Sequence, residues 1–143
     1  MEPSYEDDSQ SPDQPERQLV VIRWPMSARA VGRARGELRE ALCGWELEGL
    51  ADTAELVLSE LMTNAVRHAR TPRGRLIETR YERREEGVRI EVHDASHRIP
   101  LTRRAAEEDE AGRGLALVGV LTGQRWGVSS RDGVGKLVWA HVG

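Results

Sequence analysis

The feature that most constrains the fold is a change of hydrophobic period in the middle of the chain. Over residues 50–69, apolar side chains recur three and four positions apart, which predicts one long amphipathic helix that Pro72 ends. Over residues 77–93, apolar and charged side chains alternate around a Glu-Glu-Gly turn at 85–87. That alternation predicts an antiparallel hairpin with one buried face, so helices are expected to pack against a sheet.

Two elements are expected before the long helix. Residues 18–24 form a short apolar run that Pro25 ends, which predicts a strand. Ser27 is expected to cap a helix that runs to about Cys43, with Gly44 in the stop position.

The boundaries of the later elements follow from capping and turn residues. Asp52 and Glu55 have the spacing of a capping box, so they are expected to open the long helix. After the hairpin, the expected elements are a long loop over 95–111, a short helix from 115 to about 122 that Gly123 stops, and a hairpin of 125–130 and 134–142. This order predicts an α+β fold: a two-layer sandwich whose mixed, mostly antiparallel sheet is covered on one face by about three helices.

Length and composition narrow the class of protein. The 143 residues suffice for one core, and no stretch approaches the roughly 18 apolar residues of a membrane-spanning helix. The acidic start lacks the pattern of a signal peptide. The single cysteine, Cys43, excludes an internal disulfide and a cysteine-built zinc site, and it is expected to pack at a helix end. A cytoplasmic protein without membrane contact is therefore expected.

Charge argues against direct nucleic-acid binding. The net charge is −3, and residues 1–17 hold six acids and one arginine, which leaves the remaining chain close to neutral. A nucleic-acid-binding domain usually has a clear basic excess. The same segment has three prolines and almost no apolar residues, so we expect a disordered acidic tail over 1–17 and one domain over 18–143.

The first candidate site lies within the long helix. Glu60, Asn64 and His68 follow one another at intervals of four, so they form one stripe beside the apolar face. A carboxylate can act as a general base, and an amide oxygen one turn later suits Mg²⁺. A zinc site is a poorer alternative because the stripe offers one histidine. A solvated polar edge is the plain structural alternative.

Two further candidates follow in the chain. Asp94 has the same strand parity as the apolar residues of 88–92, so it is expected on the buried face, either as an acceptor for an exocyclic amine or as a cap of the next loop. Gly112, Arg113, Gly114 and Leu115 stand directly before a helix, where glycines allow a ligand to approach the backbone. An ordinary loop-to-helix junction is the alternative for that segment.

In this order the motifs resemble those of the GHKL (Bergerat-fold) ATPase superfamily. LVLSELMTNAVRHA at 56–69 is similar to its N box, IEVHDAS at 90–96 to its first glycine box, and GRGLALV at 112–118 to its second. The resemblance spans about residues 18–143. Within the superfamily the chain looks like the small stand-alone anti-sigma-factor serine/threonine kinases and related actinobacterial ATP-binding regulators.

The resemblance implies ATP and Mg²⁺ as ligands and gives each motif residue a role. Glu60 would be the general base, Asn64 would hold Mg²⁺ at the triphosphate, and Asp94 would recognise adenine. The remaining implied contacts are to phosphate: Arg67 and His68 at the end of the N box, and Gly112, Arg113, Gly114 and Leu115 at the second glycine box. The loop over 97–111 would be a lid over the nucleotide.

The sequence departs from the family pattern at two places. Ala95 and the residues after it replace the glycines that usually follow the adenine-binding aspartate, and Leu137 stands where many members have a threonine near adenine. His93 and His97 are expected at the pocket rim or in the loop. The two departures favour the alternative function, a nucleotide-binding or nucleotide-free adaptor without catalysis. A plain structural domain with coincidental motifs is the remaining alternative.

The resemblance also implies partners. A kinase of this kind would switch between an anti-sigma-factor antagonist and a sigma factor, and relatives usually form homodimers. Arg29, Arg33, Arg35 and Arg39 lie on one predicted helix, either as a solvated face or as a partner surface.

Overall fold

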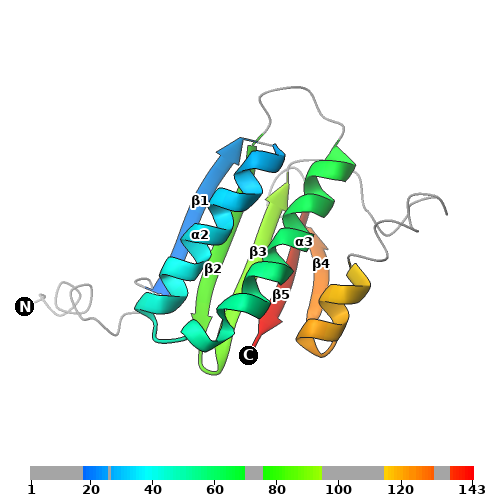
Figure 1. Cartoon of the computed structure of the whole chain (residues 1–143). Coiled ribbons are helices and arrows are strands. Elements are labelled where there is room, and N and C mark those ends of the chain that lie inside the picture. The colour runs from blue at the N-terminus through cyan, green and yellow to red at the C-terminus, as the bar shows by residue number, and fades with distance from the viewer. Residues whose placement is uncertain (1–17, 26, 70–75, 95–114, 131–135) are drawn as a thin grey trace, which may run out of the picture.

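The computed structural model describes residues 18–25, 27–69, 76–94, 115–130 and 136–143. The elements follow in the predicted order (Figure 1). They are strand β1 (Leu19–Pro25), helix α2 (Ala28–Gly44), the 3-10 turn η2 (Glu48–Leu50), helix α3 (Ala51–Ala69), strands β2 (Leu76–Arg84) and β3 (Gly87–Asp94), a helix over residues 115–122, and strands β4 (Trp126–Ser130) and β5 (Lys136–Val142). The expected tail over 1–17 and the loop over 95–111 lie outside the described residues, and those two predictions stay untested.

The five strands form one sheet in the order β1-β2-β3-β5-β4. All four strand pairings in the described part of the chain are antiparallel, so these strands contain no parallel pair of the kind a mixed sheet would have. Strand β3 lies at the centre, between its hairpin partner β2 and the distant strand β5. The central strand therefore depends on one local and one long-range pairing.

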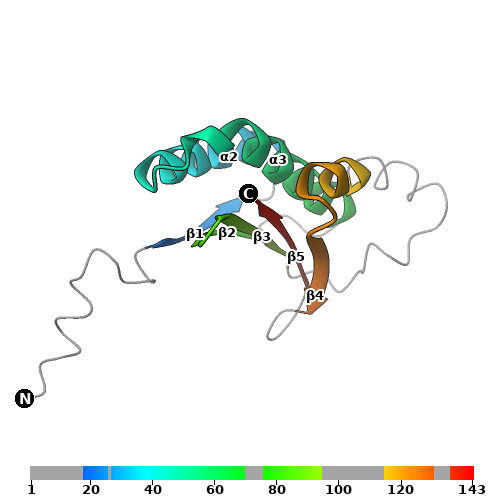
Figure 2. The same ribbon diagram turned by 90° about the horizontal axis from the view of Figure 1, so that it is seen from below.

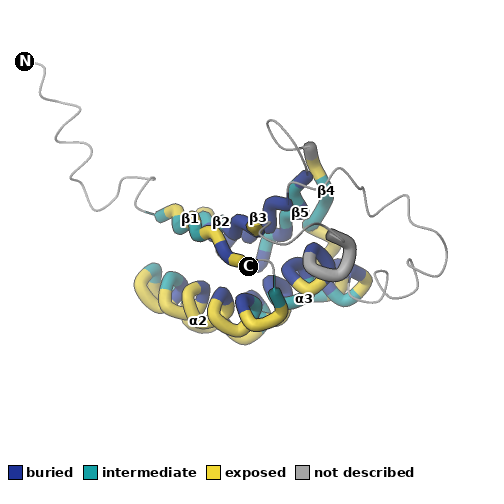
Figure 3. The backbone as a smooth tube through the Cα atoms, turned by 90° about the horizontal axis from the view of Figure 1, so that it is seen from above, coloured by how far each residue is buried: buried dark blue, intermediate teal, exposed yellow. Residues whose placement is uncertain are grey.

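The helices cover one face of the sheet, as Figure 2 shows, so the predicted two-layer α+β sandwich is confirmed. Burial follows the same division: the dark blue segments of the tube in Figure 3 lie where helices and sheet face each other. The largest fully buried side chains are Tyr81, Leu38, Leu42, Leu58, Leu61, Met62, Ile77, Ile90, Val57, Val88, Val92 and Val118. Within the described ranges, no helix is long and apolar enough to cross a membrane.

Local signals explain where α2 begins and where the last helix ends. The Ser27 side chain accepts a hydrogen bond from the backbone N–H of Ala30, which confirms Ser27 as the N-cap of α2. At the end of the 115–122 helix, Gly123 adopts a φ of +65°, a left-handed conformation that favours glycine. The Gln124 N–H then donates to the carbonyl oxygen of Gly119 at 2.7 Å, which closes the last turn.

The predicted capping box at the start of α3 is wrong. The helix begins at Ala51, directly after η2, so Asp52 already lies in its first turn. The Asp52 and Glu55 side chains instead accept hydrogen bonds from Arg39 of α2. Both carboxylates therefore bind Arg39, a residue of another helix, and the local spacing of Asp52 and Glu55 does not predict that contact.

The arginines of α2 divide into two pairs. Arg35 and Arg39 form ion pairs with the acids of α3, whereas Arg29 and Arg33 are exposed. The arginines of α2 thus serve in part as contacts to α3 and in part as solvated surface residues. Cys43 is exposed, which corrects the expectation that it packs at the helix end.

Candidate functional site

Helix α3 places Glu60 and Asn64 one turn apart, at the border between its buried and exposed sides. The neighbouring residues Leu61 and Ala65 are buried in the core, which fixes the rotation of the helix on the sheet. Glu60 remains half-buried and accessible, while Asn64 is only 7% exposed. Glu60 and Asn64 therefore border the apolar face as predicted, and the side chain of His68, the third residue of the stripe, lies outside what the structure describes.

Asn64 is an unusual buried residue. Its side-chain oxygen Oδ1 is buried and has no hydrogen-bond partner among the described residues. An unsatisfied buried polar group costs about 1–3 kcal/mol, so natural structures rarely keep one without a use. An amide oxygen is a ligand that Mg²⁺ accepts, so this side chain fits the metal that the N-box resemblance implies.

Strand β3 presents Asp94 at its last position. Its parity places it on the helix-covered face with Val88, Ile90 and Val92, and it is 2% exposed, as the alternation predicted. The Nζ atom of Lys136, the first residue of β5, lies 3.3 Å from the Oδ2 atom of Asp94. The buried carboxylate therefore has a cationic partner, as a charge in the interior requires.

Asn64 and Asp94 lie at the same end of the molecule. Asn64 lies in the last third of α3 and Asp94 ends β3, and the final turns of α3 and the arrowhead of β3 lie at the same end in Figure 1. Helix α3 packs on β3 and β5. The fold thus brings the amide and the carboxylate toward one region between helix and sheet.

The residue beside Asp94 in the neighbouring strand is Lys136, whereas Leu137, the expected departure from the family pattern near adenine, is the next residue of β5. In the β3–β5 register Asp94 faces Lys136, whereas Leu137 faces His93. Burial alternates along β5, so Lys136 shares the helix-covered face with Val138 and Leu137 lies on the other face. Sequence reasoning missed Lys136 because strand parity was not applied across the final hairpin.

The remaining predicted contacts are only partly described. Arg67 and His68 lie near the end of α3, and for these two residues the structure describes the backbone but not the side chains. Gly112, Arg113 and Gly114 lie outside the described residues. Leu115 begins the described part of the last helix, and its side chain belongs to the hydrophobic core. Any contact of Leu115 with a ligand would therefore use its backbone.

His93 lies on the uncovered face of the sheet, opposite Asp94, which corrects its expected place at the pocket rim; His97 lies outside the described residues. The Nε2 atom of His93 is 2.7 Å from Oε1 of Glu91, and Nε of Arg89 is 2.7 Å from Oε2 of the same carboxylate. The bond to His93, and after it the bond from Arg89, lower the pKa of Glu91 from 4.5 to about 2, against the opposing effect of burial.

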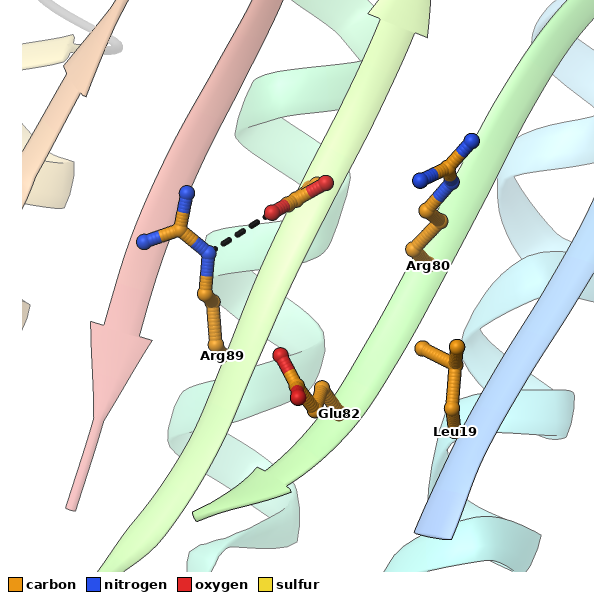
Figure 4. Close-up of a pocket in the computed structure, with 5 residues that line it drawn as sticks. Leu19, Arg80, Glu82 and Arg89 are labelled. Atoms are coloured by element: carbon orange, nitrogen blue, oxygen red, sulfur yellow. Dashed lines mark hydrogen bonds and ion pairs between the residues drawn. The ribbon is translucent and has the colours of Figure 1, made fainter. Parts of the chain in front are cut away.

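The same uncovered face carries a surface hollow (Figure 4). It is lined by Leu19, Arg80, Glu82, Arg89 and Glu91. Its arginines and glutamates largely neutralise one another, and the sheet separates it from Asn64 and Asp94. We therefore place the candidate site on the helix-covered side, at the end where β3 and α3 finish.

A family model described as a histidine kinase-like ATPase domain matches residues 24–141 of the chain. The matched range contains Glu60, Asn64, Asp94 and Lys136. Among curated proteins, none matches this chain.

Proposed function

The chain belongs to the histidine kinase-like ATPase domain family, and from that premise we propose that it is an ATP-dependent serine/threonine kinase of the anti-sigma-factor type. The family implies ATP binding. The observation that carries the proposal further is the buried Oδ1 atom of Asn64, which has no hydrogen-bond partner in the part of the chain that the structure describes. It lies one helical turn after the accessible carboxylate of Glu60. This arrangement offers a metal ligand and a base side by side.

The proposed roles follow from the chemistry of each group. Mg²⁺ held by Asn64 would supply positive charge at the triphosphate. Glu60 would accept the proton of the attacking serine or threonine hydroxyl, and its half-exposed position leaves it within reach of a partner protein. Asp94 would accept a hydrogen bond from the amino group of adenine.

The other implied contacts belong to the same proposal. Arg67, His68, Gly112, Arg113 and the backbone of Gly114 and Leu115 would bind phosphate. The partner would be an anti-sigma-factor antagonist, a sigma factor, or each in turn, and a homodimer would be the assembled form. The exposed pair Arg29 and Arg33 on α2 is available to a partner.

The first test is calorimetric titration of the purified chain with a non-hydrolysable ATP analogue, with and without Mg²⁺. Micromolar, Mg²⁺-dependent binding would support the proposal. Absence of binding at millimolar analogue would overturn it. The kinase step is then tested by transfer of labelled γ-phosphate to antagonist proteins, where Glu60→Gln is expected to abolish transfer but leave analogue binding within about twofold.

One observation favours the adaptor as a second candidate. The Asp94 carboxylate is already bonded to Lys136, so part of its capacity to accept a hydrogen bond is used within the protein. An adaptor would bind its protein partner equally well with wild-type Glu60 and with Glu60→Gln, and no phosphate would be transferred. A kinase would lose partner phosphorylation while keeping the complex.

A further inference from the structure

Lys136 and Asp94 form a buried ion pair on the helix-covered face of the sheet. They are direct partners in the β3–β5 register, and the Nζ and Oδ2 atoms lie 3.3 Å apart. Asp94 is 2% exposed and Lys136 is 5% exposed. The pair is therefore a feature of the protein interior and not a surface contact.

The stability of the folded chain does not require an ion pair at this position. The other β5 residues on the same face are Val138, Ala140 and Val142, all apolar. Replacing a buried ion pair by apolar residues is often neutral or stabilising, so a sheet core gains little from keeping one. A buried pair at the end of the central strand points to a ligand.

The choice of lysine is itself informative. The chain has 21 basic residues, and Lys136 is the single lysine among them. A lysine ammonium is a compact charge with three rotatable donors, whereas the arginine guanidinium is a rigid planar fork. The position next to Asp94 thus holds a small, adjustable hydrogen-bond donor in a chain that otherwise uses arginine.

The pair offers an acceptor and a donor at one place. A carboxylate alone can accept from the 6-amino group of adenine but would repel the carbonyl oxygen of a 6-oxopurine. We infer that Lys136 broadens base recognition at the proposed nucleotide site: Asp94 accepts from a 6-amino group, and Lys136 donates to a 6-oxo group. This inference rests on the proposed function and assigns the substrate class as purine nucleotides of both kinds.

The test compares adenosine diphosphate with inosine diphosphate by calorimetry in the presence of Mg²⁺. The two bases carry an amino or an oxo group at position 6, and the 6-oxo base also carries a proton on N1. The wild-type dissociation constants are expected to lie within about tenfold of each other, because losing a hydrogen bond to a charged group would cost about tenfold or more. Lys136→Met is expected to weaken inosine diphosphate binding by at least about tenfold relative to adenosine diphosphate.

Arg89→Met is the matched control, since it removes one cation from the opposite face of the same sheet. It is expected to leave the ratio of the two constants unchanged. A wild-type preference for adenosine diphosphate above about tenfold overturns the inference, whether or not Lys136→Met folds, and so does an unchanged ratio in a folded Lys136→Met. If neither nucleotide binds, the proposed function itself fails.

Discussion

The hydroxyl group of Tyr81 donates a hydrogen bond of 3.1 Å to the backbone carbonyl oxygen of Ala34, which ties β2 to α2 within the core. Burial raises the pKa of Tyr81 well above its ordinary value, so the group remains a donor at alkaline pH. Tyr81→Phe is expected to lower the free energy of unfolding by about 1 kcal/mol, because it removes the hydroxyl and keeps the ring. Urea denaturation measures the change, and a variant as stable as the wild type would contradict it.

The Glu91 carboxylate is expected to make the free energy of unfolding depend on pH in the acid range. Its pKa is about 2 in the folded chain and 4.5 ordinarily, so its charged bonds contribute fully above pH 4.5 and are lost as the pH falls toward 2. Glu91→Gln is expected to be less stable than the wild type by about 2 kcal/mol at neutral pH, with the gap closing through that window. Glu85→Gln, at an exposed position of the hairpin turn, is the control and should show no such window.

The contact between α2 and α3 through Arg39 is expected to respond to salt. Arg39 bonds both Asp52 and Glu55, and those bonds raise its pKa, but the site is open to solvent. Arg39→Met should therefore lower the thermal midpoint at low ionic strength, with a difference that shrinks as sodium chloride is added. Arg33→Met, an exposed position of the same helix, is the control; equal salt responses of the two variants would contradict the prediction.

Two glycine-to-alanine substitutions are expected to change the free energy of unfolding in opposite directions. At Gly87 a Cβ atom would collide with the backbone carbonyl oxygen of Val142, so Gly87→Ala is expected to destabilise by about 1–3 kcal/mol. At Gly36, within α2, a Cβ atom meets nothing within 4 Å, so alanine should stabilise by about 0.5–1 kcal/mol through helix propensity. Chemical denaturation of both variants checks the pair, and a shift of the same sign in both would refute the packing argument.

Asn64 is expected to separate stability from binding. Asn64→Leu removes a buried oxygen that has no partner among the described residues, so the free energy of unfolding without nucleotide should stay equal or rise. Affinity for the Mg²⁺-dependent ATP analogue should fall by at least about tenfold, since the metal ligand is gone. Loss of stability with unchanged binding would make Asn64 a structural residue.

Much of the fold was predictable because the decisive signals are local. The alternation over 77–93 predicted both the β2–β3 hairpin and the burial of Asp94, and Ser27 predicted the start of α2. The start of α3 was not predictable, since the spacing of Asp52 and Glu55 fits a cap equally well. Their actual partner, Arg39, lies on another helix.

The site was predictable to a smaller extent. The interval of four between Glu60 and Asn64 sufficed to place both on one edge of a helix. The pairing of Asp94 with Lys136 depends on the register of two strands more than 40 residues apart, and a shift of one position would exchange Lys136 for Leu137. A single sequence does not specify that register.

The central position of β3 has a consequence for synthesis. Its second neighbour, β5, is translated only after the segment up to residue 135, so on the ribosome β3 is at first an edge strand beside β2. During that interval the ion pair between Asp94 and Lys136 cannot yet form. The proposed base site, which needs both Asp94 and Lys136, is therefore completed only after β5 has been synthesised and has paired with β3.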